Sequence, residues 1–347
     1  MKVAIATVQV PFLRGGAEGL AASLRDELRH RGIDADIVSV PFKWYPPNVV
    51  IDHMLAVRMF DLTEVNGEGI DRVITLKFPA FYIEHPLKVA WILHQHRQAY
   101  DLFGTEFGDL HQTEQGRAVA EEIARWDTAH LSAHRNLFTI SALVSRRLRE
   151  HNALESKPLY HPPPLADRFS CNGFSPFILV PGRLDPIKRQ HFAIEALGRC
   201  PGTLRLIIIG PRSGPYRERL ERLIGSLGLS ARVEIKGEVG TEEKLRLYAE
   251  CLAVYNGAYD EDYGYVTLEA FLAGKPVITH TDSGGALEFV TEGANGRIVP
   301  PDADSLASAM SALVGDMAQA RAWGGAGRAS LAEKGVDWDH VIEALLR

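Results

Sequence analysis

Short runs of hydrophobic residues alternate with longer amphipathic segments along almost the whole chain. Runs of strand length in the first half cover residues 2–8, 34–40, 72–76, 88–93 and 137–140. Those in the second half cover residues 177–180, 204–209, 233–235, 252–255 and 276–279. The intervening segments have helical spacing, as in residues 216–227, where Leu220, Ile224 and Leu227 share a face. Strands that alternate with helices predict doubly wound parallel sheets, covered by helices on both faces.

One segment interrupts this pattern, KPLYHPPPLADRF at residues 157–169, with its three consecutive prolines. Such a composition favours a stiff, extended connection between domains. A chain of 347 residues also exceeds the length that one hydrophobic core usually serves. We therefore predict Rossmann-like domains at residues 1–165 and 166–325, followed by C-terminal helices at residues 326–347. Ligands are expected in the inter-domain cleft, at the carboxyl edges of the two sheets.

Charge and composition exclude several classes of function. The net charge of -6 gives no basic excess for nucleic-acid binding. The longest hydrophobic runs are too short to span a bilayer, and the first residues lead straight into a strand with no room for a signal peptide. Three scattered cysteines, Cys171, Cys200 and Cys251, fit free thiols. These features predict a cytoplasmic protein.

Two segments of the second half carry candidate chemistry. The run at 177–180 leads into PGRLDPIK, which places Arg183 and Lys188 at the carboxyl edge of a sheet. An arginine fork and a lysine point charge suit a diphosphate there. Two solvated surface cations are the simpler interpretation, but the shared sheet edge favours a site.

The second segment is EDYGYVTLEAFLAGKPVIT, residues 261–279, in which two glutamates stand eight positions apart. A helix is expected to begin after Gly264, near Tyr265 or Val266, so that its first N–H groups form an anion site for phosphate oxygens. Glu269 lies one turn inside this helix and suits the hydroxyls of a ribose. Glu261 precedes the helix and suits the hydroxyls of a sugar beyond the phosphates. Either glutamate alone also fits a plain surface role.

A nicotinamide dehydrogenase is the first alternative, because Gly15 and Gly16 lie in the first strand-to-helix turn. The G-x-G-x-x-G spacing is missing, however, and the second strand ends without an acidic residue for a ribose hydroxyl. Metal sites are also poorly supported. The Asp260-Glu261-Asp262 stretch contains a D-x-D pattern, and His94-x-His96 would place its two rings on opposite faces of an extended chain. We expect no metal and no other cofactor.

In combination, the motifs of the second half resemble glycosyltransferase family 4, a retaining family with the GT-B fold. The resemblance covers residues 177–316 and depends on the two glutamates together with these segments: GRLDPIK at 182–188, LIIIGPRSG at 206–214, ARVEIKGEV at 231–239, AGKPVI at 273–278, GGALEFV at 284–290 and NGRIVPPDADSLA at 295–307. The first half is similar more loosely. Arg14-Gly15-Gly16 resembles the family's GG loop, and His94 ends a strand where the family places a histidine.

This resemblance implies roles for individual residues. Glu261 would contact the donor sugar and Glu269 the ribose, while Arg183 and Lys188 would hold the diphosphate. Gly15 and Gly16 would let the backbone approach the donor phosphates. His94 would lie near the transferred sugar, with His96 as the alternative. A C-terminal helix would cross back onto the first domain. In this chain it would do so only partly, because the helix at residues 338–347 is short.

The resemblance also implies a function. The expected reaction transfers a hexosyl unit from a UDP- or GDP-sugar to a saccharide acceptor, free or lipid-linked, in bacterial surface polysaccharide synthesis. A sugar-nucleotide epimerase and an inactive saccharide-binding protein are the alternatives. Asn256-Gly257 and Tyr263-Gly264-Tyr265 depart from the family's usual Pro-Ser and Gly-Phe-Gly, which leaves the donor sugar open. The arginines at 146, 147 and 149 are interpreted as a solvated helix face, so membrane association is at most peripheral.

Overall fold

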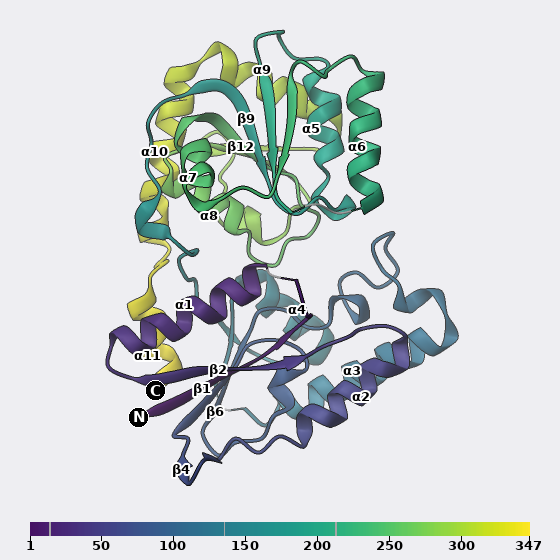
Figure 1. Cartoon of the computed structure of the whole chain (residues 1–347), viewed down its shortest axis with the longest axis vertical. Coiled ribbons are helices and arrows are strands. Elements are labelled where there is room, and N and C mark those ends of the chain that lie inside the picture. The colour runs from purple at the N-terminus through teal and green to yellow at the C-terminus, as the bar shows by residue number, and fades with distance from the viewer. Residues whose placement is uncertain (14, 135, 212–213) are drawn as a thin grey trace. The chain divides into compact units, whose positions relative to one another are not determined.

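The computed structural model describes residues 1–13, 15–134, 136–211 and 214–347. It divides the chain into two compact units: Met1–Pro164 with Asp337–Arg347, and Leu165–Val336. Each unit contains one six-stranded sheet in which every described pairing is parallel (Figure 1). The prediction of two doubly wound α/β units is therefore confirmed.

The sheet of the N-terminal unit has the strand order β2-β1-β5-β6-β7-β8. Its strands are β1 (Lys2–Gln9), β2 (Asp34–Pro41), β5 (Arg72–Thr75), β6 (Lys88–Ile92), β7 (Leu137–Thr139) and β8 (Lys157–Pro158). A separate small hairpin consists of β3 (Glu64–Val65) and β4 (Glu68–Gly69). The central strands are continuous hydrophobic runs because both faces of the sheet are covered by helices.

Helices of the N-terminal unit lie in two layers. They are α1 (Gly16–His30), α2 (Pro47–Arg58), α3 (Glu114–Leu131), α4 (Ala142–Asn152) and α11 (Trp338–Leu346), with short 3₁₀ turns at η1 (Ala80–Tyr82), η2 (Arg97–Ala99) and η3 (Leu110–Gln112). Helix α1 packs beside α11, whereas α2 and α4 both pack against α3 (Figure 1). Right-handed crossovers explain this division, because the chain passes from β1 to β2 in one direction and from β2 onward in the other.

The last helix, α11, belongs to the N-terminal unit although it follows the C-terminal one. Asp339 forms an ion pair with Arg31 of α1, and Arg72 Nη1 donates to the Leu345 carbonyl at 2.8 Å. Helix α10 (Met317–Glu333) belongs to the other unit. Residues 326–347, which we grouped from the sequence, are thus shared between the two units.

The proline-rich segment begins as part of a sheet. Residues 157 and 158 form β8, the edge strand of the sheet, which pairs with β7. His161 is then buried against the rings of Trp91 and Trp338, and this burial lowers its pKa to about 3. The extended connection predicted from residue 157 is therefore packed onto the N-terminal unit as far as Pro164.

The sheet of the C-terminal unit has the order β11-β10-β9-β12-β13-β14. Its strands are β9 (Ser175–Pro181), β10 (Arg205–Ile209), β11 (Val233–Gly237), β12 (Cys251–Asn256), β13 (Val277–His280) and β14 (Gly296–Val299). From β9 the chain moves outward to β10 and β11, and it then returns to β12 on the other side of β9. This reversal creates a topological switch point between β9 and β12.

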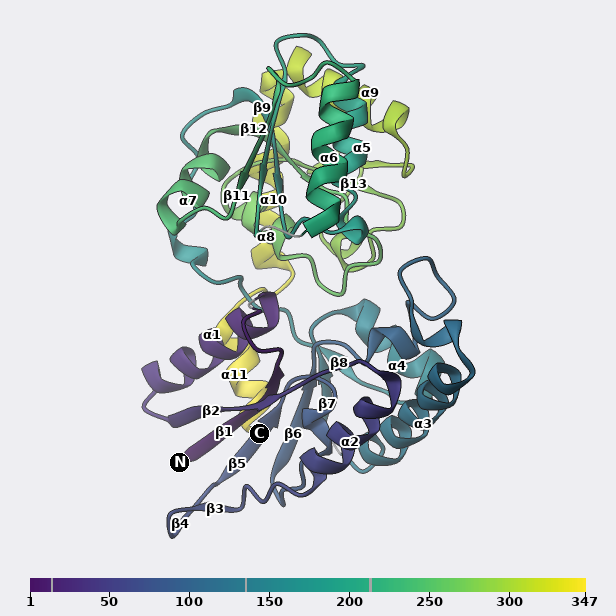
Figure 2. The same ribbon diagram turned by 45° about the vertical axis from the view of Figure 1, so that its right-hand side comes forward.

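Helices of the C-terminal unit follow the same reversal. They are α5 (Gln190–Leu197), α6 (Gly214–Ser226), α7 (Thr241–Glu250), α8 (Tyr265–Leu272), α9 (Ala303–Gly315) and α10, with 3₁₀ turns η4 (Ala166–Arg168), η5 (Pro186–Lys188) and η6 (Gly285–Glu288). Helix α5 packs with α6 and α9, and α10 packs on α8. Figure 2 shows α5 and α6 side by side, away from α7.

The core of the C-terminal unit is aliphatic, with Ile178, Leu206 and Ile208 of the central strands fully buried against α5 and α9. All three cysteines are free. In the part of the chain that the structure describes, every helix falls short of the length and hydropathy that crossing a membrane requires.

Candidate functional site

The switch point of the C-terminal unit collects the residues predicted for the diphosphate. Arg183 and Lys188 lie in the loop and 3₁₀ turn that directly follow β9. Arg183 extends outward with about half of its side chain exposed, and its Nη2 lies 3.2 Å from Asp185 Oδ2. The other oxygen of Asp185 accepts from the Ile187 N–H at 3.1 Å and so caps the turn that carries Lys188.

Arg189, the residue after this turn, is a buried anchor that the sequence analysis missed. Its backbone is left-handed, with φ 52°, and its side chain points inward. Nε donates to the Gly257 carbonyl at 2.7 Å, and Nη2 donates to the Ala258 carbonyl at 3.2 Å. The guanidinium also forms a fork with both oxygens of Asp282, at 2.7 and 2.8 Å. One side chain thus connects the loops that follow β9, β12 and β13.

Glu261 lies in the loop after β12 and is paired with Lys188. The ammonium of Lys188 donates to Glu261 Oε2, and both side chains are about a quarter exposed. The backbone of Glu261 is held in place by Gly284 and Gly285, because the Gly285 N–H donates to the Glu261 carbonyl at 2.6 Å. Gly284 has φ 63°, and a Cβ there would lie 2.6 Å from that carbonyl oxygen. Glycine is therefore required at this approach.

Helix α8 begins at Tyr265, as predicted. Gly264 precedes it with φ 92°, a left-handed conformation that turns the chain from the β12 loop into the helix. Tyr265 and Val266 supply the first N–H groups of the helix. The start of α8 follows β12, so these groups lie at the carboxyl edge of the sheet beside the switch point.

Glu269 is buried one turn inside α8 and has two partners from α7. Its Oε1 accepts from Lys244 Nζ at 2.6 Å, and its Oε2 accepts from the Tyr248 hydroxyl at 2.6 Å. Burial and the neighbouring carboxylate raise the pKa of Tyr248 well above its usual value, so this hydroxyl remains a donor. The carboxylate is fixed in position while each oxygen retains a free lone pair.

Two departures from the family pattern have a packing explanation. The ring of Tyr255 lies over Gly257, where a Cβ would come within 2.0 Å of the tyrosine oxygen. Asn256 is buried, and its Nδ2 donates to Thr267 Oγ1 of α8 at 3.1 Å. Tyr263 is also buried, with its ring edge-on to Tyr265 and Phe289. These residues therefore support the loop and the start of α8 from within.

In the N-terminal unit, Gly15 and Gly16 form the exposed start of α1, just beyond β1. The Gly15 N–H donates to Glu18 Oε2 at 2.8 Å, and Glu18 Oε1 lies 3.2 Å from Lys77 Nζ after β5. These contacts connect the loops after β1 and β5, the two strands at that sheet's own switch point. Arg14, the first residue of the predicted GG loop, lies outside the described residues.

The two candidate histidines follow β6 and differ in environment. His94 is partly exposed, and its Nδ1 lies 2.6 Å from the Gln95 carbonyl. His96 is buried beside the rings of Phe42 and Phe78. Burial and the nearby His94 lower the pKa of His96 to about 3, so its imidazole is neutral at physiological pH. The structure thus gives His96 the environment of a core histidine.

A buried polar cluster supports the loop of residues 94–96, here called the histidine loop. The carboxyl of Asp127 in α3 accepts from the hydroxyls of Tyr82 and Tyr100, the latter at 2.7 Å. Gln95 Nε2, in the histidine loop itself, donates to Asn152 Oδ1 at 2.7 Å. Burial raises the pKa of Asp127 to about 7, although hydrogen bonds from the two tyrosines and Gln95 oppose this rise. The hydrogen-bond donors to this carboxyl are thus the two tyrosine hydroxyls and the Gln95 amide.

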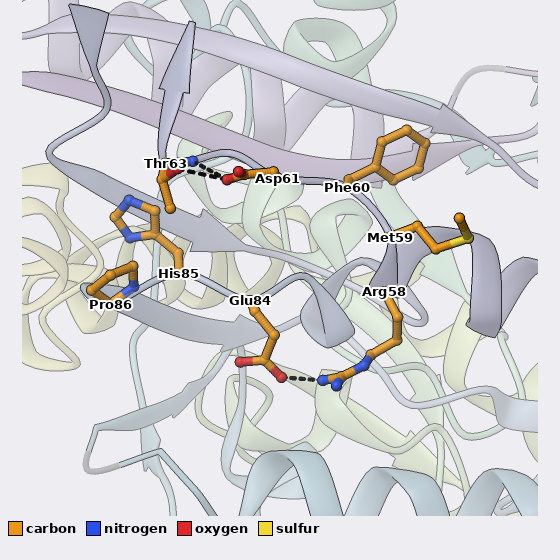
Figure 3. Close-up of a pocket in the computed structure, with 8 residues that line it drawn as sticks. All are labelled: Arg58, Met59, Phe60, Asp61, Thr63, Glu84, His85 and Pro86. Atoms are coloured by element: carbon orange, nitrogen blue, oxygen red, sulfur yellow. Dashed lines mark hydrogen bonds and ion pairs between the residues drawn. The ribbon is translucent and has the colours of Figure 1, made fainter.

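Other candidate features lie apart from both switch points. Within the described residues, no three histidine, cysteine, aspartate or glutamate side chains gather closely enough to hold a metal ion. The pocket in Figure 3 includes residues 84–86, which precede β6, so it lies at the opposite edge of the sheet from His94; no predicted site residue lines it. The arginines of α4 are not one solvated face, because Arg147 is buried with its Nη2 3.5 Å from Asp101.

Comparisons of the whole chain with solved structures identify the architecture. Sucrose-phosphate synthase from Thermosynechococcus elongatus superposes with a TM-score of 0.78 at 20% identity, over 99% of this chain and 96% of that one. WaaG, a glycosyltransferase involved in lipopolysaccharide biosynthesis, gives 0.69 at 17% identity, over 98% of both chains. HepE from Anabaena, in complex with UDP and glucose, gives 0.68 at 19% identity, over 99% and 97%. The chain has the GT-B fold.

A family model matches the second half of the chain. Residues 169–330 match the family model described as "Glycosyl transferases group 1". D-inositol 3-phosphate glycosyltransferase of Nocardia farcinica is 34% identical over 180 residues, which are 49% of this chain and 39% of that protein. Exopolysaccharide phosphotransferase SCO2592 of Streptomyces coelicolor is 40% identical over 154 residues, 42% of this chain and 16% of that one. The matched segments span less than half of these relatives.

Replacing Arg189 with methionine should destabilise the C-terminal unit. The change leaves the carboxylate of Asp282 and two loop carbonyls without their buried donor, and we expect a loss of about 3–5 kcal/mol in the free energy of unfolding. Urea denaturation followed by circular dichroism measures this loss. Arg199→Met is the matched control, because Arg199 forms an exposed pair with Asp304 at 2.8 Å. The control should lose less than about 1 kcal/mol; similar losses in both variants would refute the anchoring role.

Proposed function

We propose that this protein is a retaining glycosyltransferase of family 4, which transfers a hexosyl unit from a UDP- or GDP-sugar to a saccharide acceptor. The observation that carries this proposal is that the residues predicted to bind the donor converge at the switch point of the C-terminal unit. Arg183 and Lys188 follow β9 there, and Glu261, the start of α8 and Glu269 follow β12. The family model that matches residues 169–330 supports the reaction class. The complex of HepE with UDP and glucose supports the class of donor.

In the proposed site, each group contacts one part of the donor. Arg183, Lys188 and the N–H groups of Tyr265 and Val266 bind the diphosphate, since cations and a helix N-terminus both stabilise anionic oxygens. Glu269 accepts hydrogen bonds from the ribose hydroxyls. Glu261 contacts the donor sugar, and its ion pair with Lys188 supports a shared site for the sugar and the adjoining phosphate. Gly15 and Gly16 provide a backbone surface without side chains for the donor phosphates.

The proposed chemistry takes place on one face of the sugar. The bond from the anomeric carbon to the phosphate oxygen breaks, and the acceptor oxygen forms its bond on the same face. The departing diphosphate takes the acceptor's proton, so the anomeric configuration is retained without a side-chain nucleophile. Arg183, Lys188 and the helix N-terminus stabilise the charge that develops on the leaving group. This arrangement requires no metal ion.

We place the reaction in bacterial surface polysaccharide synthesis, in the cytoplasm with at most a peripheral association with the membrane. The acceptor is a free or lipid-linked saccharide. Support for this setting comes from two similar proteins, the exopolysaccharide phosphotransferase of Streptomyces coelicolor and WaaG, a glycosyltransferase involved in lipopolysaccharide biosynthesis.

Sugar transfer should proceed in EDTA, because the protein's own cations neutralise the diphosphate. The test incubates the enzyme with UDP-, GDP- and ADP-sugars, with and without saccharide acceptors, and identifies products and their anomeric configuration by NMR. An α-linked product from an α-linked donor supports the proposal. Strict dependence on magnesium or manganese would contradict the metal-free mechanism. A new sugar nucleotide formed without acceptor would identify an epimerase, and binding without turnover would identify an inactive saccharide-binding protein.

The two glutamates should affect different steps. Glu269→Gln should weaken binding of the free nucleoside diphosphate by about tenfold or more, because a charge-assisted hydrogen bond contributes about 1.5–3 kcal/mol. Glu261→Gln should leave that affinity near the wild-type value, since its contact is to the sugar. The activation free energy of transfer should rise by about 2–4 kcal/mol, so the transfer rate falls. Calorimetric titration and steady-state kinetics measure the two effects. Equal behaviour of both variants toward the free nucleotide would refute this division of roles.

The histidines provide a further test. We propose that His94 donates a hydrogen bond to a hydroxyl of the sugar as the anomeric centre flattens. His94→Ala should fold and bind nucleoside diphosphate normally. Its transfer should be slower, because the activation free energy rises by about 2–4 kcal/mol. His96→Ala should instead lower the melting temperature, because it opens a cavity beside Phe42 and Phe78. A stable but inactive His96 variant, together with an active His94 variant, would reverse the assignment.

A further inference from the structure

Lys244 is a lysine of α7 whose ammonium group lies beside the carboxylate predicted to bind the ribose. Its Nζ donates to Glu269 Oε1 at 2.6 Å. The side chain of Lys244 is about one third exposed, whereas that of Glu269 is almost fully buried. Lys244 therefore lies on the solvent side of the pair, where a ligand that reaches Glu269 would meet it as well.

The fold places this pair at the same sheet edge as the diphosphate residues. Helices α7 and α8 follow the parallel strands β11 and β12, so both helices begin at the carboxyl edge of the sheet. Lys244 is the fourth residue of α7, and Glu269 is the fifth residue of α8. Each side chain thus lies about one turn from the edge at which Arg183 and Lys188 are found.

The two partners of Glu269 differ in what they can still bind. Tyr248 is fully buried, and its single hydroxyl proton is used in the bond to Oε2. Lys244 has three ammonium protons, of which Glu269 takes one. The ring centroids of Phe169 and Tyr248 each lie 5.8 Å from Lys244 Nζ, so the two rings border the ammonium. A lysine that served only to neutralise Glu269 would not need this accessible position.

A pair composed of an acceptor and an adjacent donor fits a vicinal diol. Each hydroxyl of a ribose can donate one hydrogen bond and accept another. A hydroxyl that donates to the carboxylate can accept from the ammonium at the same time, and its neighbour can use the second carboxylate oxygen. Nothing else in a nucleoside offers two such groups on adjacent carbons.

We propose that Lys244 and Glu269 together recognise the 2′,3′-diol of the donor's ribose, and that Lys244 makes the site selective for ribonucleotides over deoxyribonucleotides. This inference rests on the proposed function, since it assumes that a nucleoside diphosphate binds at this switch point. Glu269 accepts from the diol, and Lys244 both positions that carboxylate and donates to one of the hydroxyls. A site that hydrogen-bonds a hydroxyl rejects an analogue that lacks it, because the protein's polar groups are then left unpaired.

The test measures a ratio of affinities, which a purely structural role of Lys244 would not change. Calorimetric titration first establishes which of UDP, GDP and ADP the wild-type protein binds. The dissociation constants of that nucleotide and of its 2′-deoxy and 3′-deoxy forms are then compared. We expect the wild-type protein to prefer the ribonucleotide over at least one deoxy form by about tenfold or more. Lys244→Met, which keeps the length of the side chain, should reduce this preference to within about threefold.

Two further variants sharpen the test. Lys244→Arg retains a donor beside Glu269 and should keep part of the preference. Lys236→Met is the matched control, because Lys236 lies on β11 and forms ion pairs with Glu234 and Glu243 at 2.9 and 3.0 Å, away from Glu269. It should keep the full wild-type ratio. Melting temperatures, measured alongside, report the folding of each variant.

The possible results separate this inference from the proposed function. A wild-type protein that binds no nucleoside diphosphate would overturn both. An unchanged ratio of affinities in Lys244→Met would overturn only the role of Lys244. This includes the case in which the variant binds all three nucleotides more weakly by the same factor. A wild-type protein that does not distinguish ribose from deoxyribose would also overturn it.

Discussion

The candidate site of the C-terminal unit depends on one buried cation, the guanidinium of Arg189. Loops at the carboxyl ends of β9, β12 and β13 are irregular and lie side by side, with the Tyr259 N–H donating to the Ile187 carbonyl at 2.8 Å and the Asp260 N–H to the Asp282 carbonyl at 2.9 Å. Arg189 supplies donors to two further carbonyls of these loops and to the Asp282 carboxylate, so all three loops share a single charged centre. Five N–H donors in a rigid plane make arginine suited to this task, which a lysine could not perform with the same geometry.

A second constraint is the balance of charge around the site. Each carboxylate proposed for the site has a lysine partner: Lys188 for Glu261 and Lys244 for Glu269. These pairs hold negative charge next to the place proposed for a dianionic diphosphate, where isolated carboxylates would repel it. The glutamates can therefore address hydroxyl groups while the local charge remains near neutral. Arg183, whose side chain is about half exposed beside Asp185, and the start of α8 are the groups that we propose for the phosphates.

The sequence allowed the architecture to be predicted because strand alternation and turn glycines are local signals. Hydrophobic runs identified nearly all the central strands, and the glycine before Tyr265 correctly marked the start of α8. Residues whose roles depend on distant contacts could not be found in this way. Arg183 and Arg189 lie in the same loop, yet only Arg189 turns inward, because its partners are 68 to 93 positions further along the chain. The burial of Arg147 and the pairing of β8 have the same origin, since each depends on a neighbour brought by the fold.

Lys244 shows the same limit and explains why a motif describes a site only in part. The spacing of Glu261 and Glu269 is a pattern within one segment, and it can be recognised without a structure. The partners that orient these glutamates come from other segments: Lys188 precedes Glu261 by 73 residues, and Lys244 precedes Glu269 by 25. A carboxylate's preference for one hydroxyl arrangement depends on its rotamer and on the donors beside it, which those partners determine. Selectivity is therefore a property of the assembled sheet edge, and proteins that share both glutamates can differ in the ligands they prefer.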